Sequence, residues 1–172
     1  GWGDKVLEKL NGFFALAIHD KETDELFLAR DRMGIKPLLV YRDSEAIVFG
    51  SEMKSLMAFG IPKQIDANSQ FLYHQFNYTP FPETIFENVE ELEPGTWIKV
   101  RGSKVETGTY WSIPKPTAPK TKMSYEQAQN KLRELMEKSV QRRMISDVPL
   151  GSFLSGGIDS SIIATLAARQ TG

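Results

Sequence analysis

The 172-residue sequence contains no cysteine, so disulfide bonds, thiolate metal sites and a cysteine nucleophile are excluded within this chain. No apolar run approaches the ~18 residues that a membrane-spanning helix needs. Neither sign of charge is in excess, because 21 Lys and Arg residues are set against 22 Asp and Glu residues, which gives a formal net charge of −1. A nucleic-acid partner would require a basic excess. We therefore expect a globular chain with small-molecule partners, and with neither nucleic acid nor membrane as a partner.

Short apolar runs alternate with polar turns through the first two thirds of the chain, a pattern typical of antiparallel strand pairs. The run from Phe13 to His19 is continuous and predicts a strand that is buried on both faces. Short helices are expected over 52–58 and from a cap at Asp66 or Asn68 to Gln75. The further predicted strands lie at 26–30, 37–41, 46–50, 97–100 and 105–111. This combination predicts an α+β domain with antiparallel sheets.

A domain boundary is predicted between residues 113 and 120, where three prolines stand close together in the sequence. We assign residues 1–112 to a first domain, 113–123 to a linker and 124–172 to the beginning of a second, α/β domain. Ser124 and Gln127 have the spacing of a capping box at the start of an amphipathic helix. After that helix, residues 148–154 are predicted to form a short strand.

The most specific chemical signal in the sequence is a loop predicted to join that strand to a following apolar helix. Adjacent Gly156 and Gly157 let the backbone turn tightly and approach an anion closely. The first turn of the next helix would present free N–H groups and a partial positive charge. Serine hydroxyls can add donors to phosphate oxygens. The predicted binding set for phosphate or pyrophosphate is Ser155, Gly156, Gly157, Asp159, Ser160 and Ser161.

Asp159 separates this loop from a Walker A motif, which would carry a lysine after the glycines. A carboxylate next to bound phosphates repels them unless a cation lies between, so Asp159 indicates Mg²⁺. The alternative is an ordinary strand-to-helix turn in which Asp159 and Ser160 cap the helix.

Residues 155–161 resemble the pyrophosphate loop of the N-type ATP pyrophosphatases, and residues 144–151 resemble the segment that precedes it in glutamine-hydrolysing asparagine synthetases. Segments at 10–15, 29–38, 50–56 and 91–95 are similar to the glutaminase domain of the same family. The resemblance implies a class II glutamine amidotransferase domain of the αββα N-terminal-nucleophile fold, joined to an ATP-pyrophosphatase domain.

By this resemblance the substrates are ATP, aspartate and glutamine. The full-length protein would be a cytoplasmic ligase, with a homodimer as a further expectation. Aspartate would be amidated through a β-aspartyl-adenylate, releasing AMP and pyrophosphate, with ammonia supplied from glutamine. Leu154 would border the adenosine, and residues 155–161 would hold the phosphates.

The catalytic glutaminase residues are expected to be missing, because the family nucleophile is an N-terminal cysteine and position 1 here is Gly. Neither end of the sequence looks like a natural terminus, so an internal fragment is expected that does not itself hydrolyse glutamine. Two alternatives stay open: another ligase of this architecture, of the β-lactam synthetase type, and a non-catalytic glutaminase-like scaffold.

A dense group of charges at Arg30, Asp31, Arg32 and Lys36 is a second candidate site. We interpret it as a structural ion-pair network next to the glutaminase core, with a catalytic role as the alternative.

Overall fold

The structure is a computed structural model that describes residues 3–115 and 121–170. The chain divides into two compact units, Gly1–Lys115 and Pro116–Gly172. The predicted linker over 113–123 falls at this division, and its residues 116–120 lie outside the described part of the chain.

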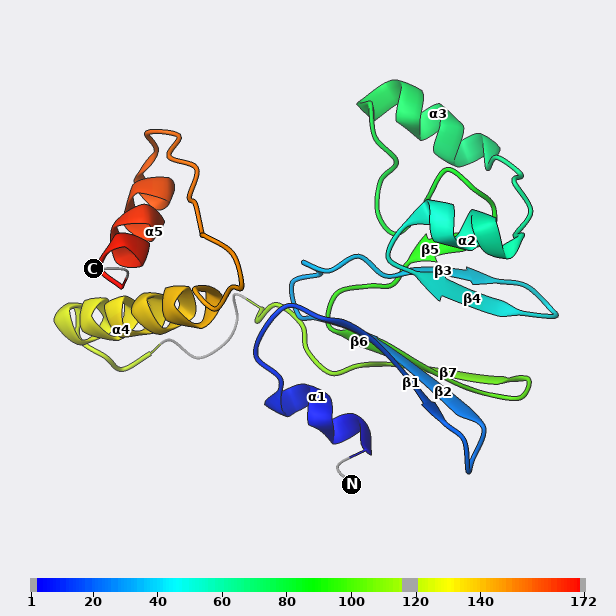
Figure 1. The fold of residues 1–172 in the computed structure, drawn as a ribbon, viewed down its shortest axis with the longest axis horizontal. Coiled ribbons are helices and arrows are strands. Elements are labelled where there is room, and N and C mark those ends of the chain that lie inside the picture. The colour runs from blue at the N-terminus through cyan, green and yellow to red at the C-terminus, as the bar shows by residue number, and fades with distance from the viewer. Residues whose placement is uncertain (1–2, 116–120, 171–172) are drawn as a thin grey trace. The chain divides into compact units, whose positions relative to one another are not determined.

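Two antiparallel sheets form the body of the first unit (Figure 1). The four-stranded sheet has the order β1-β2-β6-β7, and the three-stranded sheet has the order β4-β3-β5. The strands of the first sheet are β1 (Ala15–Asp20), β2 (Glu25–Arg30), β6 (Thr96–Arg101) and β7 (Lys104–Thr109). Those of the second are β3 (Leu39–Arg42), β4 (Ile47–Gly50) and β5 (Val89–Glu91). The antiparallel hairpins expected from the sequence are therefore confirmed.

Short helices flank the two sheets. A 3₁₀ turn, η1 (Gly3–Lys5), leads into α1 (Val6–Lys9), and α2 (Met53–Phe59) and α3 (Ala67–Phe76) follow β4. The helix α2 ends at Gly60, whose φ of 105° lies in the left-handed region that glycine tolerates. The helix α3 starts at Asp66, whose side chain accepts the Ser69 N–H at 2.6 Å.

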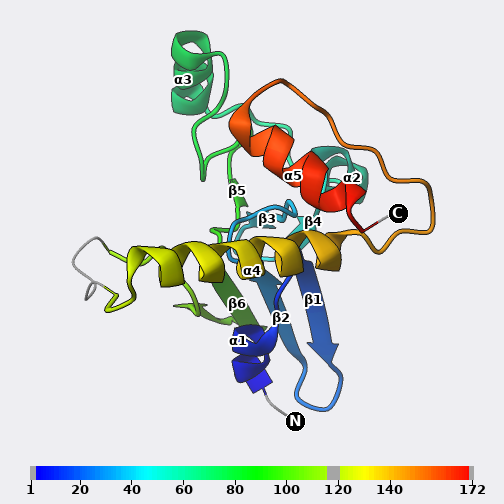
Figure 2. The same ribbon diagram turned by 90° about the vertical axis from the view of Figure 1, so that its left-hand side faces the viewer.

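Three separate clusters of buried side chains show how these elements are layered. Along β2, Phe27 and Ala29 pack with Leu7 of α1, whereas Leu28 between them packs with Val40 of β3 and Ile98 of β6. On the other side of the second sheet, Tyr41 and Val48 pack with Leu56 of α2. The order is helix, sheet, sheet, helix, and both views place α1 and α2 on opposite sides of the sheets (Figure 1 and Figure 2). The expected α+β class is confirmed.

The prediction that the strand starting near Phe13 is buried on both faces is wrong. Among the described residues, the strand β1 pairs with β2 alone, and His19, Asp20 and the side chain of Ile18 are exposed. A continuous apolar run is typical of a central strand. An edge strand has a neighbouring strand on one side only, so its side chains are covered less completely.

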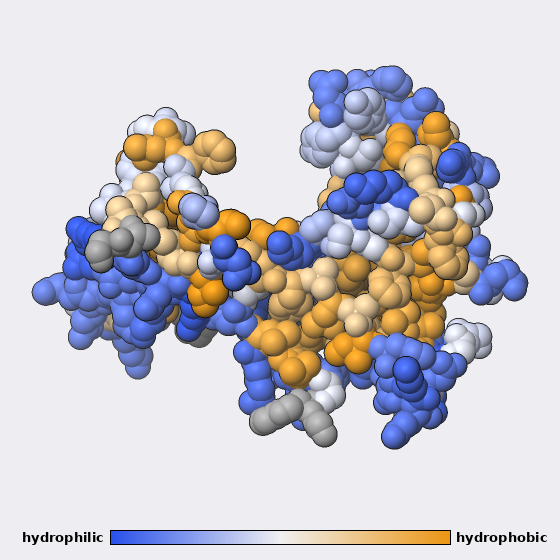
Figure 3. Space-filling view, viewed as in Figure 1, coloured by the Kyte–Doolittle hydropathy of each residue, from blue (hydrophilic) through white to orange (hydrophobic). Residues whose placement is uncertain are grey.

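In the second unit, the described residues 121–170 form two helices, α4 (Tyr125–Arg143) and α5 (Ile158–Ala168). The predicted capping box is confirmed, because Ser124 Oγ accepts the Gln127 N–H at 3.2 Å and Gln127 Oε1 accepts the Ser124 N–H at 2.9 Å. The surface over α4 is mostly hydrophilic in the space-filling view (Figure 3).

The predicted strand at 148–154 is wrong. These residues are coil with exposed side chains, and Phe153 is fully exposed. A β-strand is stabilised by pairing with a neighbour, and residues 121–170 contain no strand with which it could pair.

Candidate functional site

The glycine loop of the second unit, residues 155–157, lies immediately before α5. Gly156 has a φ of 82°, which is unfavourable for any residue with a Cβ, and Gly157 is the N-cap residue with a φ of −76° and a ψ of 160°. A Cβ added at Gly156 would have nothing within 4 Å, so backbone conformation and not crowding requires glycine there. The loop is exposed throughout. It is thus a tight turn that leaves the start of the helix open.

The N-terminus of α5 offers backbone donors. No side chain of residues 3–115 or 121–170 caps it, and the first helical N–H that bonds back is that of Ser161, which donates to the Gly157 carbonyl at 3.1 Å. The N–H groups of Ile158, Asp159 and Ser160 precede it in the first turn, where a helix supplies no carbonyl partner. Donors of this kind, combined with the helix dipole, favour an anion.

The serine hydroxyls are used differently from the sequence-based expectation. Ser160 Oγ and Ser161 Oγ both donate to the Gly157 carbonyl, at 3.0 and 2.8 Å. Ser155 Oγ lies 3.0 Å from Ser160 Oγ and accepts the Gly157 N–H at 3.4 Å. These bonds stabilise the turn from within. A bound phosphate would meet backbone N–H groups first, and the hydroxyls would have to rotate to reach it.

Asp159 and Leu154, the two other residues of the predicted site, lie on either side of Gly156 and Gly157. Asp159 is an exposed residue in the first turn of α5, and Leu154 is an exposed residue just before the loop. Residues 3–115 and 121–170 contain no group of three or more His, Cys, Asp and Glu side chains that could hold a metal ion. A single carboxylate fits Mg²⁺ only as a partial ligand, with phosphate oxygens and water completing the coordination.

The charged group in the first unit turns out to organise a loop. The Asp31 carboxylate is 1% exposed and accepts four backbone N–H groups, at 3.0 to 3.2 Å. Its donors are Phe14, Met33, Ile35 and Lys36. Burial alone would raise the pKa of Asp31, but the four hydrogen bonds outweigh burial and hold that pKa below its ordinary value.

Arg30 complements Asp31 by holding carbonyl groups. It is 5% exposed and donates to the carbonyls of Gly34, Lys36 and Leu92 at 2.7 to 2.9 Å. It also forms an ion pair with Glu91 at 3.1 Å. The structural interpretation of this segment is thus supported, although most of its bonds join side chains to the backbone and are not ion pairs.

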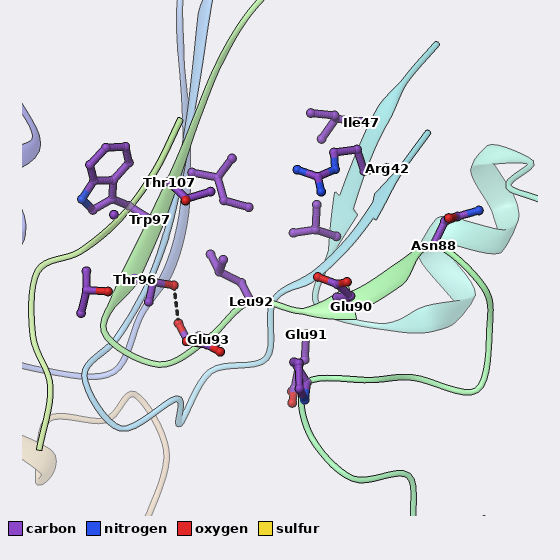
Figure 4. A pocket seen from close by; sticks show the side chains of 15 residues that line it. Arg42, Ile47, Asn88, Glu90, Glu91, Leu92, Glu93, Thr96, Trp97 and Thr107 are labelled. Carbon is purple, nitrogen blue, oxygen red and sulfur yellow. Dashed lines mark hydrogen bonds between the residues drawn. The ribbon is translucent and has the colours of Figure 1, made fainter. Parts of the chain in front are cut away.

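A cavity of about 490 Å³ in the first unit was not signalled by the sequence (Figure 4). It lies between the two sheets, where Thr96 Oγ1 donates to the Glu93 carbonyl at 2.7 Å. A local sequence pattern does not predict this cavity, because its lining residues come from several strands that are far apart in the sequence. Its polar lining includes Arg42, Asn88, Glu90, Glu91, Glu93, Thr96 and Thr107, and its apolar lining includes Val40, Ile47, Leu92 and Ile98.

In the described part of the chain, none of the helices has the length and apolar character needed to cross a membrane.

Two family models match the chain, one on either side of the proline-rich segment. Residues 1–111 match the glutamine amidotransferase domain, and residues 131–172 match asparagine synthase. The second match contains the whole glycine loop and all of α5.

Similar proteins extend across nearly the full chain. A protein of Mycobacterium tuberculosis, provisionally named a glutamine-hydrolyzing asparagine synthetase, is 37% identical over 98% of this chain and 27% of its own length. Asparagine synthetase [glutamine-hydrolyzing] 1 of Bacillus subtilis is 36% identical over 95% of this chain and 26% of its own. Amidase chry2 of Gibberella zeae is 30% identical over 98% of this chain and 25% of its own. The chain spans about a quarter of the length of these relatives.

Proposed function

The chain belongs to the glutamine amidotransferase domain family, which matches residues 1–111, and from this premise we propose that it forms part of a glutamine-hydrolysing asparagine synthetase. The proposed reaction consumes ATP and aspartate, forms a β-aspartyl-adenylate, and releases AMP and pyrophosphate when ammonia from glutamine displaces the AMP. The chain would contribute the later part of the glutaminase domain and the phosphate-binding beginning of the synthetase domain.

One observation carries this proposal: the uncapped start of α5 lies within residues 131–172, which match asparagine synthase, in a chain whose preceding residues match a glutamine amidotransferase. The combination indicates an enzyme that couples an ammonia source to ATP. A phosphate loop without the preceding domain would fit many nucleotide-binding proteins.

The residues of the loop divide the work of holding ATP. The N–H groups of Ile158, Asp159 and Ser160 would hold the β- and γ-phosphates, which leave together as pyrophosphate, and stabilise the charge that develops on them. Leu154 would border the adenosine. When bound, Mg²⁺ would neutralise phosphate charge, and the Asp159 carboxylate in the first turn of α5 is the group that would hold it.

The glutaminase unit would act here as a scaffold for groups supplied from outside the 172 residues. No cysteine is present, so this chain provides no thiolate for attack on glutamine. The buried Arg30–Asp31 arrangement stabilises the unit and is assigned no role in bond breaking. We include a cytoplasmic location and a homodimer of the full-length protein in the proposal, to be checked by cell fractionation and by size-exclusion chromatography.

A second candidate is a ligase of the same architecture with a different acceptor, such as the β-lactam synthetase type. The relative named as an amidase matches 98% of this chain, so likeness in this region does not define the acceptor. The acceptor can be identified by which carboxylic acid triggers pyrophosphate release. A purely non-catalytic scaffold would release none with any acid.

The test measures aspartate-dependent pyrophosphate release. The protein assayed contains this sequence and is as long as the relatives. Wild-type protein should release AMP and pyrophosphate, and Asp159→Ala should lose most of this activity. Gly151→Ala is the matched control, because a Cβ at Gly151 meets nothing within 4 Å. Unchanged pyrophosphate release by Asp159→Ala would reject the Mg²⁺ role of Asp159. Equal release with and without aspartate would reject aspartate as the acceptor.

A further inference from the structure

An exposed Asn-Gly pair lies between α1 and β1 and is independent of the nucleotide site. Asn11 and Gly12 are both exposed and belong to neither a helix nor a strand. Among residues 3–115 and 121–170, no hydrogen bond to the Asn11 side chain or to the Gly12 N–H is present. We propose that Asn11 is a site of spontaneous deamidation, at which the chain converts to an aspartyl or isoaspartyl form at position 11.

The chemistry needs only the two residues and water. The Gly12 backbone nitrogen, after loss of its proton to hydroxide, attacks the Asn11 side-chain amide carbon and forms an N–C bond. The C–N bond of the side-chain amide then breaks, and ammonia leaves with a proton from the solvent. Water opens the resulting succinimide at either of its carbonyls. Opening at the former side-chain carbonyl gives aspartate. Opening at the backbone carbonyl gives isoaspartate, in which the main chain runs through the side-chain carbonyl.

The structure leaves the attacking nitrogen free and unhindered. Glycine has no side chain to block the approach and can adopt the backbone conformations that ring closure demands. A Cβ placed on Gly12 would meet nothing within 4 Å, so the surroundings are open as well. The side chain of Asn11 can therefore swing toward the Gly12 nitrogen without displacing any packed group.

Each of the other asparagines is protected by the residue after it or by its own helix. The Ser69 N–H, after Asn68, donates to Asp66 at 2.6 Å, and the Val89 N–H, after Asn88, donates to the Phe86 carbonyl at 3.4 Å. Asn130 lies inside α4, where the backbone is held in the helix. Asn77 caps α3 and is followed by the bulky Tyr78. Only at Asn11 do free backbone, exposure and glycine coincide in the described chain.

Deamidation here would alter a junction in the core of the first unit. Leu10 before the pair and Phe14 after it both pack against the buried cluster of Leu7, Phe27 and Ala29. An isoaspartyl linkage adds a carbon atom to the backbone between Leu10 and Phe14, which disfavours the packing of both side chains in their present positions. We expect α1 to detach more easily from the sheet, and the aspartyl form to change little.

The experiment incubates the full chain in mildly alkaline buffer and follows each asparagine by peptide mass mapping. The peptide with position 11 should gain about one dalton and become a substrate for isoaspartyl methyltransferase, whereas peptides with the other asparagines should not. Gly12→Ala should deamidate on the order of tenfold more slowly, since a Cβ hinders ring closure. Asn11→Gln, whose ring closure is harder, should show no gain at this position.

Each alternative result is decisive. An unchanged position 11 peptide in the folded chain, with rapid conversion of the same peptide after unfolding in urea, would show that the native structure protects the site. Equal rates for wild type and Gly12→Ala would exclude attack by the Gly12 nitrogen. Earlier conversion at Asn77 than at Asn11 would contradict the ranking by structure.

Discussion

Arg30 and Asp31 are neighbours on the chain and bind the same loop through its two kinds of backbone group. Asp31 accepts the N–H groups of Met33, Ile35 and Lys36, and Arg30 donates to the carbonyls of Gly34 and Lys36. Both side chains are buried, yet hydrogen bonds satisfy their polar atoms, which is the condition under which burial of charge is tolerated. The pair explains how a loop of charged residues can form a rigid part of the fold.

Replacing Asp31 with Asn should destabilise the first unit strongly. An amide has one acceptor oxygen, and its NH₂ group would face backbone N–H donors that the carboxylate now satisfies. We expect a loss of about 3 kcal/mol in the free energy of unfolding, measured by urea denaturation. The control is Asp20→Asn, since Asp20 accepts the Glu22 N–H at 2.9 Å from an exposed position. That change should cost much less, and equal losses would contradict the role assigned to burial.

The same carboxylate gives the first unit an acid-sensitive stability. The pKa of Asp31 is lower in the folded chain than the ordinary 3.8, so its ionised form stabilises the fold fully above the unfolded pKa. This contribution should decline as pH falls below about 4 toward the folded pKa. Urea midpoints measured at several acidic pH values should therefore fall more steeply for wild type than for Asp31→Asn. Parallel slopes would show that other carboxylates cause the acid sensitivity.

Gly95 should be far less replaceable than Gly102, although both have positive φ values, 70° and 55°. A Cβ on Gly95 would overlap the carbonyl oxygen of Trp111, whereas a Cβ on Gly102 meets nothing within 4 Å. Gly102→Ala should cost only the backbone strain of about 1 kcal/mol. Gly95→Ala adds a clash with backbone atoms and should cost at least about 2 kcal/mol more. Thermal unfolding of the two variants checks the difference.

Local features of this fold could be predicted from short stretches of sequence. Asp66 caps α3 and Ser124 caps α4, because an acceptor side chain at the right spacing bonds to a free N–H whatever the rest of the chain does. The hairpins likewise follow from apolar runs around polar turns. The coil at 148–154 shows the limit of such reasoning. Its apolar pattern predicts a strand, but a strand also needs a partner.

In the candidate site, too, local features can be predicted from the sequence and features that depend on the fold cannot. Two adjacent glycines followed by a helix start are local features, and the sequence predicts them. The bonding of Ser160 and Ser161 to the Gly157 carbonyl depends on rotamers that a sequence pattern does not contain. The four donors to Asp31 include Phe14, which is 17 residues away and joins it through the pairing of β1 with β2. Such long-range contacts follow from the fold and not from local spacing.

Glu134 should titrate far below an ordinary glutamate. Its carboxylate lies 2.5 Å from Lys138 Nζ and 2.9 Å from Lys131 Nζ on the surface of α4. These two ammonium groups lower the pKa of Glu134 from 4.5 to about 2. The two ion pairs of Glu134 stabilise α4 above the unfolded pKa, and this effect should fade as pH falls from about 4.5 to about 2. NMR titration of the carboxyl carbon measures the midpoint directly. Lys138→Gln should move that midpoint upward, and an unchanged midpoint would contradict the assigned cause.

Gly156→Ala should weaken binding of pyrophosphate by the chain, and Gly151→Ala should not. The φ of 82° at Gly156 costs a residue with a Cβ about 1 to 2 kcal/mol, so the turn that exposes the first N–H groups of α5 would be less populated. That cost corresponds to a dissociation constant raised about 5- to 30-fold. Gly151 has no positive φ and an open surrounding, so its Cβ leaves the loop unchanged. Amide chemical shifts of Ile158, Asp159 and Ser160, followed by NMR during titration with pyrophosphate, give both the affinity and the place of binding. Equal affinities for the two variants would mean that the anion does not use this turn.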